Sequence, residues 1–319
     1  MKKSNLVFLC LILVCHECFG AANPGGYLVA VGDCGSDSLN RTLDQVVSHS
    51  SNVVATSLRV ACSGLLLDAN GTVKAWGYEN TKMVEELNRL TGVTAVAVGS
   101  SHCLALKKDG TVVVYGDAHF DKTTVPAGVT NVSAIAAAGW ENCVALKRDG
   151  SVVGWGMTKV PAGLANVGAI SLSSSWNGRN LVLKRDGTVL QWINQARAEP
   201  VAGLSNIVAI SAGAVHSLAL RSDGTVAAWG YNGNGQTTVP DGLTNVVAIA
   251  AGGYANPGMR GSGFSLALKS DGTVVGWGWW KDKAGIVPAG LTDVVAISAA
   301  DAAWVAITTN RAVAEKFRR

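Results

Sequence analysis

The chain has 319 residues, of which 48% are hydrophobic and 15% are charged, and it contains 38 glycines. This composition fits a single domain of many buried strands joined by tight turns. The formal net charge is +4 at pH 7 and falls by one if Lys2, Lys3 and Glu17 are removed with a leader, which excludes the strongly basic footprint of a typical nucleic-acid-binding domain.

The N-terminus is typical of an export signal. Lys2 and Lys3 give it a positive start, Leu6–Val14 is an apolar run too short to span a bilayer, and small residues follow at Gly20–Ala22. We therefore expect residues 1–22 to be a signal peptide and residues 23–319 to be one domain. This mature protein should be secreted, periplasmic or at the cell surface, with no membrane span.

The rest of the chain repeats one unit. A turn glycine recurs in steps of 37 to 48 residues, at Gly71, Gly110, Gly150, Gly187, Gly224 and Gly272. Each unit holds three strand-like runs rich in Val, Ile and Leu, and helical spacing appears only weakly at Met83–Leu90. A unit of this size cannot bury its own apolar face, so the copies must stack as propeller blades.

Each of the three kinds of run occurs seven times. The third kind starts one element early, at Tyr27–Gly32, and has no clear member after Asn310. The N-terminal strand should therefore supply the missing third strand of the last blade. The sequence predicts an all-β fold, a seven-bladed β-propeller of short antiparallel blades closed by this N-terminal strand.

Residue size predicts the packing within each blade. The first run is rich in alanine, which suits the crowded zone around the axis, so we place it innermost. The third run carries an aromatic residue that should wedge between neighbouring blades, at Trp76, Tyr115, Trp155, Trp192, Trp229 and Trp277, with Val31 in the N-terminal copy. An Asp-Gly pair between the second and third runs favours a tight two-residue hairpin.

These repeats, such as "SLALRSDGTVAAWG" from Ser217, resemble those of the regulator-of-chromosome-condensation family, whose members fold as seven-bladed propellers. The resemblance covers nearly the whole chain after the leader. The short blades and the "GQTTVP" connector (Gly235–Pro240) look more like a compact bacterial branch, which includes a propeller-type secreted inhibitor of β-lactamases. The segment after Thr308 departs from the repeat, since it lacks both the Asp-Gly pair and the Trp.

Four cysteines remain after the leader. Cys34 follows the N-terminal strand and Cys62 lies in a loop of the next blade, so a Cys34–Cys62 disulfide could pin that strand. Cys103 and Cys143 occupy one slot in adjacent blades, where the expected role is that of small buried thiols.

An antiparallel meander sorts the loops onto two faces. The upper face, as we call it, carries the loops between first and second strands and those after third strands; the lower face carries the Asp-Gly turns. Aromatic and varied polar residues collect in the upper loops, and such residues are enriched at protein interfaces. We expect partner-binding residues at His102, Trp140, Trp176, Arg179, His216, Tyr254, Arg260, Trp279, Trp280 and Trp304. Some of these rings could instead only cap the blade ends.

The lower face combines basic residues with the turn aspartates, and we interpret it as a solvated rim without nucleic-acid binding. Its basic residues are Lys107, Lys108, Lys147, Arg148, Lys184, Arg185, Arg221 and Lys269. The sequence contains no metal-ligand spacing, no phosphate loop and no catalytic constellation. We therefore expect no enzyme activity, no catalytic residues, no metal and no cofactor.

The sequence favours a secreted, monomeric scaffold that binds a partner protein through its upper face. The resemblance adds a sharper version, inhibition of a secreted enzyme such as a β-lactamase. A carbohydrate-binding propeller that uses its tryptophans as sugar platforms is an alternative. Nucleotide exchange on a small GTPase is disfavoured by the export signal and by the near-neutral charge.

Overall fold

The computed structural model describes residues 26–32, 52–58, 64–76, 81–99, 102–116, 124–139, 142–156, 159–175, 178–193, 197–254, 262–278, 287–300 and 303–317. The expected signal peptide, Cys34 and Cys62 lie outside the described residues.

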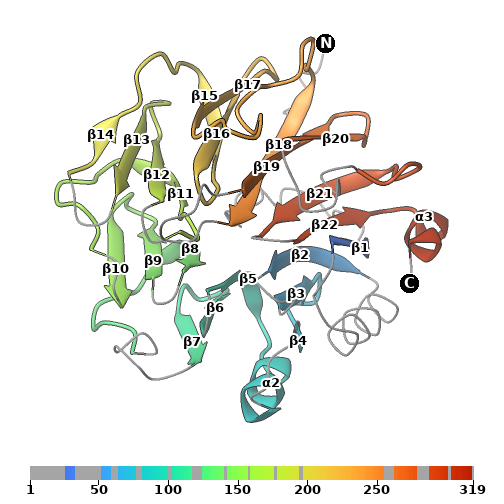
Figure 1. Ribbon diagram of the computed structural model, residues 1–319. Helices are drawn as coiled ribbons and strands as arrows, with labels where there is room; N and C mark the ends of the chain where they lie inside the picture. The colour runs from blue at the N-terminus through green and yellow to red at the C-terminus, as the bar shows by residue number, and fades with distance from the viewer. Residues whose placement is uncertain are drawn as a thin grey trace, which may run out of the picture.

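Seven antiparallel sheets form the blades of a propeller (Figure 1). In chain order, blades one to three are β2 (Val53–Leu58), β3 (Gly64–Asp68) and β4 (Val73–Trp76); β5 (Val93–Val98), β6 (His102–Lys107) and β7 (Val112–Gly116); and β8 (Val132–Ala138), β9 (Asn142–Lys147) and β10 (Val152–Gly156). Blades four and five are β11 (Val167–Ser171), β12 (Arg179–Lys184), β13 (Val189–Ile193) and β14 (Glu199–Pro200); and β15 (Ile207–Ala212), β16 (His216–Arg221) and β17 (Val226–Gly230). Blades six and seven are β18 (Val246–Tyr254), β19 (Ser262–Lys269) and β20 (Val274–Gly278); and β21 (Val294–Ala299), β22 (Ala303–Thr308) and β1 (Tyr27–Gly32).

The N-terminal strand completes the last blade, as the sequence predicts. Strand β1 pairs antiparallel with β22, from Tyr27 opposite Thr308 to Gly32 opposite Ala303. Gly26 also exchanges two backbone hydrogen bonds of 3.0 Å with Val53 at the start of blade one. The first and last described strands, β1 and β22, therefore meet in blade seven, which lies against blade one.

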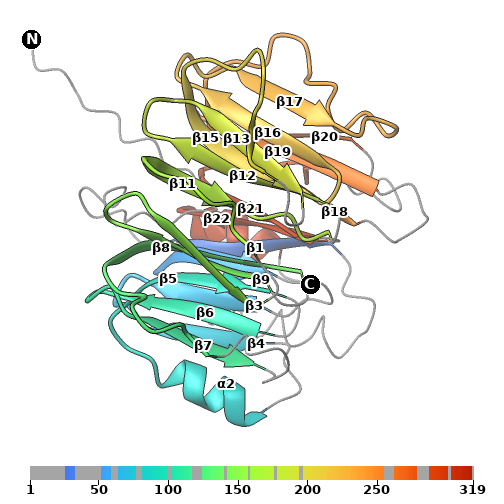
Figure 2. The same cartoon turned by 90° about the vertical axis from the view of Figure 1, so that its left-hand side faces the viewer.

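The first strand of each blade lies next to the axis. Contacts between first strands run from β2 through β5, β8, β11, β15, β18 and β21 and back to β2. Figures 1 and 2 show the blades arranged around this axis, with the third strands toward the outside. Small side chains make this close approach possible, because alanines such as Ala134, Ala250 and Ala296 are all buried there.

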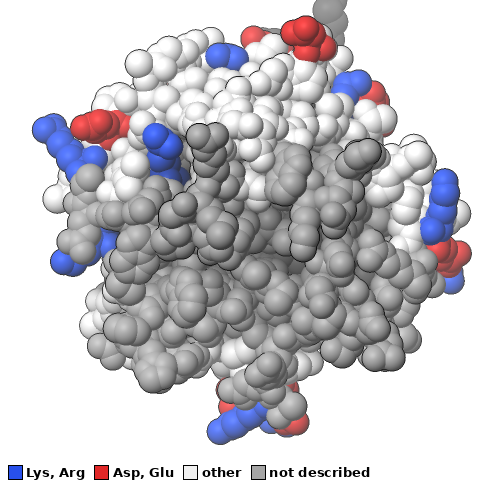
Figure 3. Space-filling view, in the orientation of Figure 1, with Lys and Arg blue, Asp and Glu red and all other residues white. Residues whose placement is uncertain are grey.

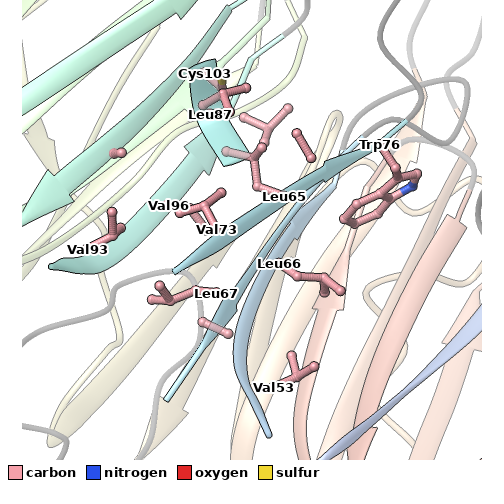
Figure 4. Packing of buried hydrophobic residues seen from close by; sticks show 14 of the residues in the cluster. Val53, Leu65, Leu66, Leu67, Val73, Trp76, Leu87, Val93, Val96 and Cys103 are labelled. Carbon is pink, nitrogen blue, oxygen red and sulfur yellow. The ribbon is translucent and has the colours of Figure 1, made fainter. Parts of the chain in front are cut away.

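The aromatic residue of each third strand packs toward the preceding blade, which confirms the predicted wedge for the six aromatic copies. Figure 4 shows the arrangement in blade one, where Leu65 and Leu67 lie on the side of Val96 in blade two. Leu66 and Trp76 lie on the opposite side, where the same cluster includes residues of blade seven. This alternation is the two-residue period of a strand.

Hydrophobic clusters of the other blades repeat this arrangement. Tyr115 packs against a cluster that spans blades one and two, and Trp155 belongs to a cluster shared by blades two and three. Trp192 joins blades three and four, Trp229 joins blades four and five, and Trp277 joins blades five and six. The core is therefore a series of blade–blade interfaces.

Serines on the first strands tie neighbouring blades at the axis. The hydroxyl of Ser211 in blade five accepts a hydrogen bond of 2.9 Å from the amide of Ala251 in blade six. Ser57 and Ser171 make the equivalent bonds of 3.0 Å to the next blades. Because these amides lie among the closely packed first strands, the hydroxyls satisfy donors that would otherwise be buried unpaired.

Backbone hydrogen bonds clasp the blades together on the lower face. The residue before each first strand has a left-handed conformation, with φ between 55° and 69°, at Asn52, Gly92, Asn131, Asn166, Asn206, Asn245 and Asp293. In five of the seven blades the next residue then donates to the turn glycine of the preceding blade, as Val132 does to Gly110 at 3.3 Å and Val246 does to Gly224 at 3.1 Å. Glycine, Asn and Asp tolerate this conformation best, which explains the choice of residues.

The Asp-Gly turns differ from the predicted two-residue hairpin. Only the glycine has a positive φ, for example 83° at Gly110, and Asp109 does not. Lys107 accepts from Gly110 at 2.9 Å and donates to Thr111 at 2.9 Å, which closes a three-residue loop. This is a type I turn followed by a left-handed glycine. Asp109 does not adopt the left-handed conformation, because its carboxylate instead accepts a hydrogen bond from the amide of Thr111.

Three further elements cover parts of the outer strands. Helix α2 (Thr81–Asn88) buries Met83 and Leu87, and the Asn88 side chain accepts from the amide of Ala75 in β4 at 2.9 Å. This agrees with the weak helical spacing noted at Met83–Leu90. The short β14 adds an unpredicted fourth strand to blade four. After Thr308 the chain forms α3 (Arg311–Lys316), which is capped by the Asn310 side chain.

Candidate functional site

Many of the expected partner-binding residues fall in upper-face loops that the structure does not describe. Trp140, Trp176, Arg260, Trp279 and Trp280 lie outside the described residues. The backbone of Tyr254 ends β18 and pairs with Ser262, but its side chain is not described. Their partner-binding role stays a prediction, as does carbohydrate binding by the tryptophans.

Three of the expected contact residues are buried, in contrast to the expectation that a partner could reach them. The exposed fraction is 0% for His102, 2% for His216 and 0% for Trp304. Trp304 lies within β22, opposite Val31 and Ala299, and belongs to the core of blade seven. These three residues hold the blade ends in place beneath the upper surface.

The histidines are buried because each packs over a glycine at the end of the neighbouring first strand. A Cβ at Gly99 would overlap the ring of His102, and one at Gly213 would lie 3.0 Å from Cε1 of His216. Aromatic rings often cover strand glycines in this way. Each His has a Gly three residues before it in the sequence, but this spacing alone does not show that the imidazole ring packs over the glycine and becomes buried.

His216 belongs to a buried polar cluster between blades five and six. Its Nε2 lies 2.9 Å from the hydroxyl of Ser265, and that hydroxyl lies 2.8 Å from the carbonyl of Gln236. The single hydroxyl proton of Ser265 is donated to this carbonyl, so the Nε2–H of His216 is the donor to Ser265. This bond therefore fixes a proton on Nε2 of His216.

This Ser–His pair has the spacing of a nucleophile and its base but not the accessibility. Ser265 and Gln236 are 0% exposed, and Ser265 uses its proton to bond a carbonyl. Burial lowers the pKa of His216 from 6.5 to about 4, and a backbone hydrogen bond with Phe264 opposes this shift. The cluster stabilises the interface between blades five and six. It could not be predicted from the sequence because the three residues lie far apart along the chain.

Uncharged residues dominate the described part of the upper face. Few of the described residues at or near the strand ends on this face are charged: Lys159 follows blade three, and Arg179, Arg197 and Glu199 belong to blade four. Arg179 is half-buried at the start of β12. Figure 3 views this face; among the described residues that it colours, most Lys, Arg, Asp and Glu side chains lie near the margin.

The upper-face loop that follows β17 is fully described, and its residues are hydrogen-bonded to one another. The Asn232 side chain accepts from the amide of Thr237 at 2.9 Å and donates to the hydroxyl of Thr238 at 3.0 Å. Gln236 accepts from the amide of Asn234 at 2.9 Å. Such bonds give the loop a fixed shape that is suited to presenting side chains to a partner.

The lower face concentrates ionised groups. Hydrogen bonds from the Thr111 hydroxyl and amide lower the pKa of Asp109, and equivalent bonds lower the pKa of Asp149, Asp186 and Asp223. Hydrogen bonds from Thr273 and Lys269 lower the pKa of Asp271 to about 2. These fully exposed carboxylates therefore stay charged at neutral pH.

The two described cysteines are buried and free, as expected. Burial raises the pKa of Cys103 to about 12, so its thiol stays protonated and unreactive at neutral pH. The proposed disulfide between Cys34 and Cys62 falls outside the described residues. Within the described part of the chain, no group of three His, Cys, Asp or Glu residues could hold a metal ion, and no helix is long and apolar enough to cross a membrane.

Comparison with known families adds to this geometry. A family model described as the regulator of chromosome condensation (RCC1) repeat matches residues 93–120 and 207–236. These segments cover blades two and five, with parts of the loops that follow them. Two segments of the chain therefore match the RCC1 repeat. No curated protein sequence matches the chain significantly.

Solved structures of RCC1-type propellers share the fold. Prp20p from Saccharomyces cerevisiae, studied for its binding to Gsp1p and histones, is 16% identical over 92% of this chain and 94% of its own, with a TM-score of 0.67. The yeast RCC1 bound to Kap60 gives a TM-score of 0.67 at 15% identity, covering 98% and 92% of the two chains. Human WBSCR16 gives 0.60 at 16% identity, covering 81% and 87%. At these identities the likeness concerns the fold of the RCC1-repeat propeller.

Proposed function

We propose that this RCC1-repeat propeller is a non-enzymatic scaffold that binds a partner protein through its upper face. The observation that supports it is the uneven distribution of charge between the two faces. The described strand ends of the upper face carry few charges, whereas the lower face carries a charged turn on blade after blade. Protein interfaces are depleted in charged residues at their centre, which favours the upper face.

The chemistry of the described residues supports binding over catalysis. The Ser265–His216 pair is enclosed and its hydroxyl proton is committed to the Gln236 carbonyl. RCC1-type propellers in solved structures include proteins studied as complexes with other proteins. This supports a binding role at the level of the fold, while the partner of this chain is left to experiment.

Site-specific photo-crosslinking tests the proposal. A crosslinking residue would replace Ser174, which is exposed on the upper face of blade four, and in the matched control it would replace Ser222, which is exposed in a lower-face turn. We expect the same partner to be captured repeatedly from Ser174 and lost in the Trp140/Trp176/Trp279 triple alanine variant. Capture from Ser222 alone would reject the upper face as the binding surface.

We also propose export and, more sharply, inhibition of a secreted enzyme, both of which rest on sequence. Mass spectrometry of the extracytoplasmic protein should find a new N-terminus at Ala21 or Asn23; a mature protein that retains Met1 would reject the signal peptide. The inhibitor version predicts slower turnover by a purified β-lactamase in the presence of excess propeller. Unchanged turnover would remove this version and leave the scaffold proposal intact.

A further inference from the structure

In blades two to six, the first residue of the lower-face turn is basic and is matched to the aspartate of the same turn. Lys184 Nζ lies 3.7 Å from Asp186, and Lys269 Nζ lies 3.1 Å from Asp271. Lys107, Lys147 and Arg221 occupy the same position in their turns and also act electrostatically on their aspartates. To a first approximation, each of these pairs has no net charge.

The second position of the turn distinguishes one part of the ring from the rest. It is an exposed cation in three adjacent blades, at Lys108, Arg148 and Arg185, and we call these three residues the basic arc. Blades five and six carry Ser222 and Ser270 at this position. The surplus positive charge of the turns is therefore confined to blades two, three and four.

Backbone hydrogen bonds fix the spacing of the basic arc. Lys108 lies in the turn whose Gly110 accepts from Val132, and Asn131, the neighbour of Val132, accepts from the amide of Arg148 at 2.9 Å. The same series links Arg148 to Arg185 through Gly150 and Asn166. In addition, the Arg185 guanidinium donates to the Arg148 carbonyl at 2.8 Å. The three cations thus project from a rigid series of turns.

We propose that the basic arc is a second interaction surface, which binds an acidic segment of a protein. Arginine and lysine pair with carboxylates through charge-assisted hydrogen bonds, and one cation per blade suits carboxylates that are spaced along an extended chain. A nucleic-acid duplex fits less well. Its closely spaced phosphates would also meet the carboxylates of Asp109, Asp149 and Asp186, which remain ionised beside the arc.

The repeat itself supplies matched variants for a test. Replacing Lys108, Arg148 and Arg185 by serine copies the residue that the same slot takes at Ser222 and Ser270, so the turns should keep their fold. The reverse variant, Ser222→Lys with Ser270→Lys, extends the arc into blades five and six. The probe is a fluorescent peptide of alternating Asp and Glu, titrated with the full mature chain at low and at physiological ionic strength.

We expect the triple serine variant to bind the acidic peptide about tenfold more weakly at low ionic strength, and the reverse variant to bind it more tightly. Circular dichroism and thermal unfolding of each variant should match the parent protein. Equal peptide binding by the parent and the triple variant would overturn the proposal. So would tighter binding of a DNA duplex than of the peptide at every salt concentration, because the surface would then favour nucleic acid. Either result leaves the upper-face proposal unaffected.

Discussion

Acidification should weaken the fold through one buried side chain, His216. Its pKa is about 4 in the native structure, against an ordinary value of 6.5. Between these two pH values the unfolded chain binds a proton that the native protein does not. Stability therefore falls as the pH is lowered through this window and is unaffected by His216 above it.

The size of the effect follows from the shift. A difference of about 2.5 pKa units, at roughly 1.4 kcal/mol for each unit, gives a loss of about 3 kcal/mol by pH 4. This is a large part of the free energy of unfolding of an ordinary domain, which is about 5–15 kcal/mol. The turn aspartates have lowered pKa values, so their contribution is lost only below their ordinary value of 3.8.

The assay compares the parent protein with His216→Gln. Glutamine keeps a neutral donor that can reach Ser265, and it does not titrate. Urea unfolding would be measured for both proteins between about pH 7 and about pH 4, and the difference in free energy of unfolding plotted against pH. Subtraction removes every titrating group that the two proteins share. We expect the advantage of the histidine protein to shrink by about 3 kcal/mol as the pH falls; a flat difference would falsify the reasoning.

Substitutions at three further positions test the blade–blade packing, the left-handed residue before a first strand and a hydrogen bond between blades, each by urea unfolding at neutral pH. Trp192→Ala should lose about 3–5 kcal/mol, because this buried ring fills the interface between blades three and four; a loss under about 1 kcal/mol would contradict the wedge. Asn131→Val should lose about 1–2 kcal/mol through its left-handed backbone, whereas Asn131→Gly should be nearly neutral. Ser211→Ala should lose about 1–3 kcal/mol by leaving the Ala251 amide unpaired, and an unchanged stability would mean that this bond contributes little.

The blade count and the strand exchange could be predicted from the sequence because they depend on repetition. A run such as Tyr27–Gly32 differs from a random apolar segment only because six similar copies follow it. The same repetition located the aromatic wedge, since a large ring at one fixed slot must face the neighbouring blade. The residues that recur in every copy are those that pack in the interface between neighbouring blades.

Features that depend on how side chains and turns settle in the folded blades could not be predicted in this way. The direction in which the His102 and His216 rings fold depends on the space left by the missing Cβ of Gly99 and Gly213, which is defined only once the strands are paired. The link from His216 to Ser265 crosses between blades and joins residues far apart in the chain. The prediction of a two-residue hairpin was wrong because an Asp-Gly pair does not by itself fix the backbone conformation of the aspartate. The hydrogen bonds that its carboxylate accepts from Thr111 determine that conformation.

Blade seven gives the molecule a particular order of assembly. Its outer strand, β1, precedes every other described strand, while β21 and β22 come last. During synthesis β1 must therefore wait without its native partner until almost the whole polypeptide has emerged. In that time blades one to six can form from strands that are close in the sequence, but the ring of blades closes only once β21 and β22 have been synthesised. Loss of either β1 or β22 should consequently loosen the same blade.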